Sequence, residues 1–248
     1  QRGLDIVLAI DTSRSMLVQD LAPSRLARAR REVSGLLANL SGDRAALLAF
    51  AGDVREVAPL THDRKTLSAF VNDLNTEENL QGGTNLGAAI DRALELFDGR
   101  TGAHEAILLL TDGEDLQGEG IAAAERAKEQ GIKLFVVGMG SSQGGKIPNG
   151  RGGFVRDENG QEVISALDYD SLKELSRITG GTMLTTDQSP FPLQELYEKR
   201  LSKLDERDLV AGKERIPRDR YQEPLALAAL LMMAEMGLRE RRKRGEDS

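Results

Sequence analysis

The chain alternates between short apolar runs and longer stretches in which apolar residues recur at helical spacing. Apolar runs without polar alternation are typical of strands covered on both faces, as in parallel sheets. The spacing of Leu26, Ala29 and Val33 is an example of the helical pattern between them. We therefore predict an α/β fold with a doubly wound, mostly parallel central sheet and helices on both faces. The predicted parallel strands cover residues 6–10, 45–50, 106–110, 132–138 and 182–186.

Two segments depart from this alternation. Residues 54–60 follow the second strand after a short link, which predicts one antiparallel edge strand, and Pro59 fits an edge position. Within residues 138–167, an Asn159-Gly160 pair predicts an inserted β-hairpin. The glycines before this pair could instead cradle a phosphate, but they lack the Gly-Lys-Ser/Thr ending of a phosphate-binding loop. A C-terminal helix is expected to pack back on the domain through Leu193, Leu196, Tyr197 and Leu201.

The same spacing assigns faces and ends to several predicted helices. Glu114 and Asp115 are expected at a helix start, where acids favour the helix dipole, and Thr84 could cap the helix that follows it. In the helix after residue 60, the expected inward residues are Leu67, Phe70, Val71 and Leu74. In the helix after residue 24, the arginines expected to form a solvated face are Arg25, Arg28, Arg30 and Arg31.

The last fifth of the chain has a different composition. Ten apolar residues in a row, 225–234, precede a basic cluster at 239–244. As a helix, residues 225–238 span about 21 Å, short of a hydrocarbon core of ~30 Å, unless the count begins at Tyr221 and the flanking arginines reach the interface. The alternative is an amphipathic helix docked on the domain, but residues 225–230 offer no polar face.

We therefore divide the chain into four parts. These are a domain over residues 1–204, a charged connector over 205–220, a transmembrane helix over 221–239 and a basic cytoplasmic tail over 240–248. A basic tail on the cytoplasmic side would place the domain on the outer, periplasmic face of the membrane. Because the chain begins at Gln1 and enters the first strand without a signal peptide, we expect it to be part of a longer protein.

Composition narrows the classes of function. The net charge of −7, the 4% aromatic content and the absence of tryptophan argue against a nucleic-acid groove. The absence of cysteine excludes disulfides and thiolate metal sites. With 248 residues, of which 40% are hydrophobic, the chain can form one sizeable α/β domain with an appendage.

Candidate chemistry gathers where predicted strands end. Asp11, Ser13 and Ser15 follow the first strand, at the edge where open α/β sheets bind ligands. The stretches 82–85 and 108–113 both precede predicted helices and could complete a site. Oxygen ligands suit a hard divalent cation, and a compact set that leaves room for water suits Mg²⁺ better than Ca²⁺. Two neutral hydroxyls neutralise little of the cation's charge, so the cation should seek an anionic oxygen from outside the chain.

These three stretches resemble the metal-ion-dependent adhesion site of von Willebrand factor A domains, which has the pattern Asp-x-Ser-x-Ser, then Thr, then Asp. The resemblance implies direct coordination of Mg²⁺, with Mn²⁺ or Ca²⁺ as alternatives, by Ser13 and Ser15. It also implies coordination by Thr84 directly or through water, and by Asp11 and Asp112 mostly through water. In the alternative, Asp11 and Ser13 only cap a turn and Thr84 only caps a helix.

Other short motifs are similar to the bacterial Bat (aerotolerance) proteins, BatA- and BatB-like. They are Arg-Tyr-Gln-x-Pro-Leu-Ala-Leu-Ala at 220–228, Ala-Pro-Ser-Arg-Leu at 22–26 and Lys-Ile-Pro at 146–148. This resemblance implies a protein of the bacterial inner membrane whose domain lies between transmembrane helices. It also implies association with MoxR-type AAA+ ATPases and other von Willebrand A proteins.

Three functions are compatible with such a site. The first is a binding module without enzymatic activity, in which the cation takes a carboxylate from a partner protein. The second is a Mg²⁺-dependent phosphohydrolase or phosphoacceptor with Asp11 as nucleophile. Against it, Ser13 stands where haloacid-dehalogenase-like phosphatases carry an acidic residue. In the third, the ion only stabilises the loops.

Overall fold

The computed structural model describes residues 3–40, 42–99, 104–114, 118–186, 189 and 191–201. The predicted connector, transmembrane helix and basic tail lie outside these residues and stay predictions. No helix within the described ranges combines the length and apolar character needed to cross a bilayer.

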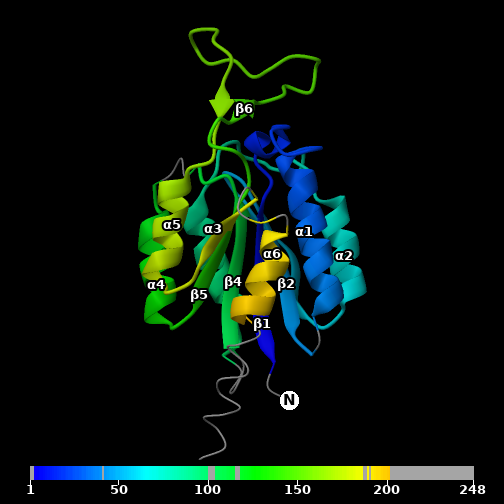
Figure 1. The fold of residues 1–248 in the computed structure, drawn as a ribbon, viewed down its shortest axis with the longest axis vertical. Helices are drawn as coiled ribbons and strands as arrows, with labels where there is room; N and C mark the ends of the chain where they lie inside the picture. The colour runs from blue at the N-terminus through cyan, green and yellow to red at the C-terminus, as the bar shows by residue number, and fades with distance from the viewer. Residues whose placement is uncertain are drawn as a thin grey trace, which may run out of the picture. The chain divides into compact units, whose positions relative to one another are not determined.

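Six strands of the described chain form one sheet in the order β3-β2-β1-β4-β5-β8 (Figure 1). Every neighbouring pair is parallel except β2 and β3, which are antiparallel at the edge. The predicted doubly wound α/β fold with one antiparallel edge strand is therefore confirmed. The strands are β1 (Leu4–Asp11), β2 (Arg44–Phe50), β3 (Val54–Thr61), β4 (His104–Thr111), β5 (Lys133–Gly138) and β8 (Met183–Thr185).

Helices cover both faces of this sheet (Figure 1). Alternate side chains of β1 enter two separate cores, with Ile6, Leu8 and Ile10 in one and Val7 and Ala9 in the other. This explains why the strand is apolar at every position rather than at every second one. The first core is closed by α1 (Arg25–Asn39), α2 (Arg64–Asp73) and α6 (Pro192–Leu196), and the second by α3 (Leu86–Glu95), α4 (Gly120–Glu129) and α5 (Tyr169–Ile178).

The structure corrects one expectation about α2 and one about α3. Phe70 is 40% exposed, because α2 packs through Leu67 and Val71 on a narrower stripe than expected. The cap of α3 is Asn85, whose side chain accepts a hydrogen bond from the backbone of Ala88, so Thr84 is not the capping residue. Thr84 is nevertheless buried, one position before the cap.

Residues 141–167 form a projecting segment that extends beyond the carboxyl edge of the sheet, at the top of Figure 1. The predicted turn is present, since Gly160 donates its N–H to the carbonyl of Asp157. The pairing is more extensive than one hairpin, because β6 (Gly145–Lys146) pairs with β7 (Ile164–Ser165) at the base of the segment. Isolated bridges join Pro148 to Phe154 and Arg156 to Glu162 farther out.

Candidate functional site

The register of the sheet brings the ends of β1 and β4 together. Ile10 pairs with Leu110, so Asp11 stands beside Thr111 and one residue before the level of Asp112. The Thr111 hydroxyl donates a hydrogen bond to Asp11 Oδ2 at 2.6 Å. Two carboxylates that are 101 positions apart in sequence therefore lie at one edge of the sheet, and both are fully buried.

The loop after β1 is held by Asp11 itself. The backbone N–H of Ser13 donates to Asp11 Oδ1 at 2.8 Å, which fixes the turn that leaves the strand. The hydroxyls of Ser13 and Ser15 share a hydrogen bond of 2.9 Å and are both nearly buried. The Asp-x-Ser-x-Ser sequence thus gathers a carboxylate and two hydroxyls within one short loop.

Asp11 lies near a second buried acid, Asp112, whose charge disfavours ionisation of Asp11. Burial, and after it the negative charge of Asp112, raise the pKa of Asp11 from its ordinary 3.8 to about 7. The hydrogen bonds from Ser13 and Thr111 act in the opposite direction but do not overcome burial. A cation between such groups would stabilise their charged forms.

An unpartnered oxygen supports the fit of a cation to these residues. Asp112 Oδ1 is buried and has no hydrogen-bond partner among the described residues. Buried polar atoms usually have a partner, so this carboxylate oxygen is free to accept a cation or a water bound to it. Together with the buried Asp11 and the Ser13 and Ser15 hydroxyls, it forms the oxygen-only donor set that a hard divalent cation prefers.

The structure places the other predicted ligand, Thr84, in the loop before α3, where its side chain is buried. The preceding residues Gly82 and Gly83 line a cavity of about 370 Å³ together with Ser13 and Arg14. Residues 148–150 of the projecting segment also line this cavity. The loop that carries Thr84 and the loop that carries Ser13 therefore face a common space.

Arg25 is a site residue that the sequence analysis missed. The expectation of a solvated arginine face is wrong at this position, because Arg25 has no exposed surface. Its Nη1 donates to Asp112 Oδ2 at 2.8 Å, and its Nε and Nη2 donate to Asp20 at 2.9 and 2.8 Å. The expectation treated the arginines of this helix as one face, but Arg25 lies one turn before the buried Ala29, at the border of the buried face of α1, whereas Arg31 is exposed on the other side.

Glu114 is also placed differently from the expectation. The helix after β4 begins at Gly120, so Glu114 does not lie at its start. Burial raises the pKa of Glu114, the charge of Asp112 raises it further, and a hydrogen bond from Ser165 lowers it. The positive charge of Arg25 also lowers the pKa of Glu114.

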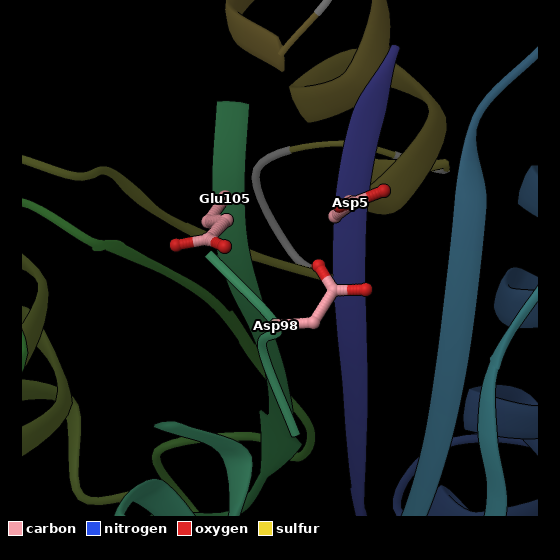
Figure 2. A group of neighbouring side chains, drawn as sticks. All are labelled: Asp5, Asp98 and Glu105. Carbon is pink, nitrogen blue, oxygen red and sulfur yellow. The ribbon is translucent and has the colours of Figure 1, made fainter. Parts of the chain in front are cut away.

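A second group of acids, Asp5, Asp98 and Glu105, offers carboxylate oxygens within 4.8 Å of one another (Figure 2). Asp5 is in β1 and Glu105 in β4, toward the amino ends of these strands and away from Asp11. Arg44 donates two hydrogen bonds to Asp5 at 2.9 and 2.6 Å and two to Asp98 at 3.0 Å each. Because an arginine already supplies the compensating charge, this group is an ion-pair network.

Comparison with known proteins identifies the family of the domain. The family model of the von Willebrand factor type A domain matches residues 5–196. The chain belongs to this family. The matched residues contain all five positions of the predicted adhesion site, from Asp11 to Asp112.

Solved structures extend the likeness to aerotolerance-related proteins. An aerotolerance-related membrane protein from Bacteroides fragilis is 32% identical, with a TM-score of 0.76, and the match covers 79% of this chain and 98% of that one. The conserved hypothetical protein BatB from Bacteroides thetaiotaomicron is 32% identical with a TM-score of 0.78, over 82% of this chain and 100% of that one. The resemblance to Bat-type von Willebrand A proteins is thereby confirmed.

Sequence relatives are bacterial and longer than this chain. An uncharacterized protein from Borreliella burgdorferi is 28% identical over 244 residues, which are 93% of this chain and 67% of the relative. A UPF0353 protein from Nocardia farcinica is 27% identical over 197 residues, which are 73% of this chain and 57% of the relative. The chain therefore spans a little over half to two thirds of these relatives.

Proposed function

We propose that this von Willebrand A domain is a metal-dependent protein-binding module that takes an acidic residue of a partner protein. Asp11, Ser13, Ser15, Thr84 and Asp112 would hold the cation, with Mg²⁺ as the resident ion and Mn²⁺ or Ca²⁺ as substitutes. When bound, the ion would supply a Lewis acid with a coordination position for an oxygen from outside the chain. The observation that carries this proposal is the unpartnered Oδ1 of Asp112 beside the buried Asp11.

The charge of the donor set supports capture of an anion. The Ser13 and Ser15 hydroxyls are neutral, and the Asp112 carboxylate is already paired with Arg25 at 2.8 Å. Asp11 is then the main uncompensated negative group among the five residues, so a divalent ion would keep part of its charge. A carboxylate from a partner would neutralise that remainder.

The same geometry disfavours the phosphohydrolase alternative. A nucleophilic aspartate needs an oxygen that a substrate can reach. Both oxygens of Asp11 accept hydrogen bonds, one from Ser13 and one from Thr111, and Asp11 has no exposed surface. We expect no turnover of a generic phosphate ester such as p-nitrophenyl phosphate with Mg²⁺, and turnover that Asp11→Asn abolishes would establish the enzyme instead.

The setting of the module is part of the proposal. We place it in the bacterial inner membrane, anchored by the helix predicted at 221–239, with the domain on the periplasmic face. The description of the Bacteroides fragilis protein as a membrane protein supports the membrane setting. Association with a MoxR-type ATPase or with other von Willebrand A proteins follows only from the Bat resemblance. Co-purification from membranes with and without EDTA tests it.

Replacing Ser13 by alanine is expected to weaken Mg²⁺ binding by roughly 100-fold, because one direct ligand is lost while the charge of the site is unchanged. Isothermal titration with Mg²⁺ measures this effect. The matched control is Ser34→Ala in α1, away from the site, since the buried Ser34 hydroxyl has no hydrogen-bond partner among the residues that the structure describes. Equal affinity of Ser13→Ala and Ser34→Ala would refute the ligand assignment.

Carboxylate capture is tested separately with a library of phage-displayed random peptides. Peptides retained in Mg²⁺ and released by EDTA are expected to contain Asp or Glu and to lose binding when that residue becomes Asn or Gln. The Ser13→Ala variant should retain none of them. Selected peptides that bind equally well after the change to an amide would contradict the proposal even if Mg²⁺ binds.

A further inference from the structure

Arg25 connects the sheet edge that carries Asp11 and Asp112 to one end of the projecting segment. Its Nη1 donates to Asp112 Oδ2 and to Ser165 Oγ, each at 2.8 Å, and its Nη2 donates to the Ser165 carbonyl at 2.9 Å. Ser165 is fully buried in β7, the strand at the base of the segment, and its hydroxyl also lies 3.3 Å from Asp112 Oδ2. One guanidinium thus contacts both the Asp112 carboxylate and the strand through which the segment returns.

The other side of the same guanidinium holds the beginning of the segment. Asp20 accepts hydrogen bonds from Arg25 and also from the backbone N–H and the hydroxyl of Ser141, at 2.9 and 3.2 Å. Ser141 in turn accepts a hydrogen bond from the N–H of Leu167. Gly140 gives Arg25 the space it needs, since a Cβ atom there would lie 2.8 Å from Nε.

This network is buried and geometrically demanding. Arg25 and Asp112 have fully buried side chains, and the side chain of Asp20 is 8% exposed. A guanidinium can serve Asp20, Asp112 and Ser165 at once because its donors form a planar fork, which an ammonium group lacks. The ends of the projecting segment and the orientation of Asp112 therefore depend on the same side chain.

We propose that Arg25 is a positioning residue that couples cation binding at Asp112 to the hydrogen bonds that hold the base of the projecting segment on the domain. This inference rests on the metal site proposed above. Arg25 holds Oδ2 of Asp112, so the unpartnered Oδ1 is the oxygen left for a cation or its water. A cation that favours this orientation of Asp112 also favours the contacts of Arg25 and Ser165, and it thereby stabilises the base of the segment.

The coupling reaches the ligand-binding surface. Residues 148–150 of the projecting segment line the cavity that Ser13 and Arg14 also line. When the base of the segment is held in place, residues 148–150 are also held in place at this cavity. The cation would lie beside Ser13, which lines the same cavity. Because coupling between two sites is reciprocal, loosening the base must also weaken cation binding by the same factor.

Hydrogen–deuterium exchange of the full chain with Mg²⁺ or EDTA tests this inference. In the unmodified protein, Mg²⁺ is expected to slow amide exchange over residues 141–167 by about fivefold or more. Arg25→Lys keeps the positive charge but not the fork, so we expect faster exchange there, no response to Mg²⁺ and roughly tenfold weaker Mg²⁺ binding. The matched control is Arg126→Lys, which alters a bidentate pair between Arg126 on the surface of α4 and Asp91.

A second variant keeps the test decisive if Arg25→Lys does not fold. Ser165→Ala leaves every charge in place and removes only the hydroxyl between Arg25 and Asp112. It should also reduce both the Mg²⁺ affinity and the protection of residues 141–167. The inference is overturned if Mg²⁺ binds but protects this segment equally in the unmodified protein and the variants, or in none of them. Mg²⁺-dependent protection without capture of acidic peptides would instead refute the proposed function and leave the coupling intact.

Discussion

Replacing Arg25 by methionine is expected to lower the free energy of unfolding by about 3–5 kcal/mol, because the buried Asp112 carboxylate then has no compensating charge from Arg25. Arg25 has no exposed surface, and its loss would leave Asp112 without the guanidinium that pairs with it at 2.8 Å and Asp20 without two hydrogen bonds. Methionine preserves much of the apolar stem, so the change isolates the guanidinium. Chemical unfolding followed by far-ultraviolet circular dichroism suits a chain without tryptophan.

Two further variants separate the lost charge from lost packing. Arg126→Met removes an arginine from an exposed pair with Asp91 and should change stability little, because solvent screens such pairs. Arg25→Met combined with Asp112→Asn should recover part of the loss, since the stranded carboxylate is then neutral. If Arg25→Met were as harmless as Arg126→Met, the buried network would contribute nothing to the fold.

The sheet could be predicted from sequence because its strands are buried on both faces. An apolar run such as residues 106–110 has few other folds available when turns and helical spacing flank it. The sheet edge that carries Asp11 and Asp112 followed from the same argument, since parallel strands end together. Periodicity therefore located the loops that meet, without any information on what their side chains contact.

Arg25 shows why the rest could not be predicted in the same way. Helical spacing records only which face a residue occupies, and it places Arg25 one turn before Ala29, at the border of the apolar stripe. Its partners Asp112 and Ser165 are 87 and 140 positions away, and no local pattern encodes such contacts. The additional pairing within residues 141–167 was missed for a related reason, because two-residue strands such as β6 carry no period to detect.

In metal-free protein, the stability of the domain is expected to fall between about pH 4 and pH 7 through Asp11. The pKa of this group is about 7 in the folded state and 3.8 ordinarily, so the folded state keeps a proton that the unfolded state has lost in this window. Stability therefore decreases as pH rises through the window and stays low above it. The full shift corresponds to a contribution on the order of 4 kcal/mol.

Asp11→Asn removes this titration and supplies the measurement. In EDTA, the variant should be more stable than the unmodified protein at pH 8, and this advantage should shrink toward pH 4, where Asp11 is protonated. The difference between the two unfolding curves cancels the other titrating groups. The matched control is Asp168→Asn, an exposed cap of α5 that asparagine can also fill.

Mg²⁺ should reverse the order of the two proteins at pH 8. The unmodified chain gains stability as the cation binds to the folded state, with a gain that grows with the ratio of Mg²⁺ concentration to Kd. Asp11→Asn lacks the charged oxygen and should gain almost nothing, although its metal-free fold is the more stable of the two. This combination separates a ligand from a structural residue, since a purely structural aspartate would make the variant less stable with and without Mg²⁺. Lower stability of Asp11→Asn in EDTA at pH 8 would therefore contradict the assignment of Asp11 to a cation site.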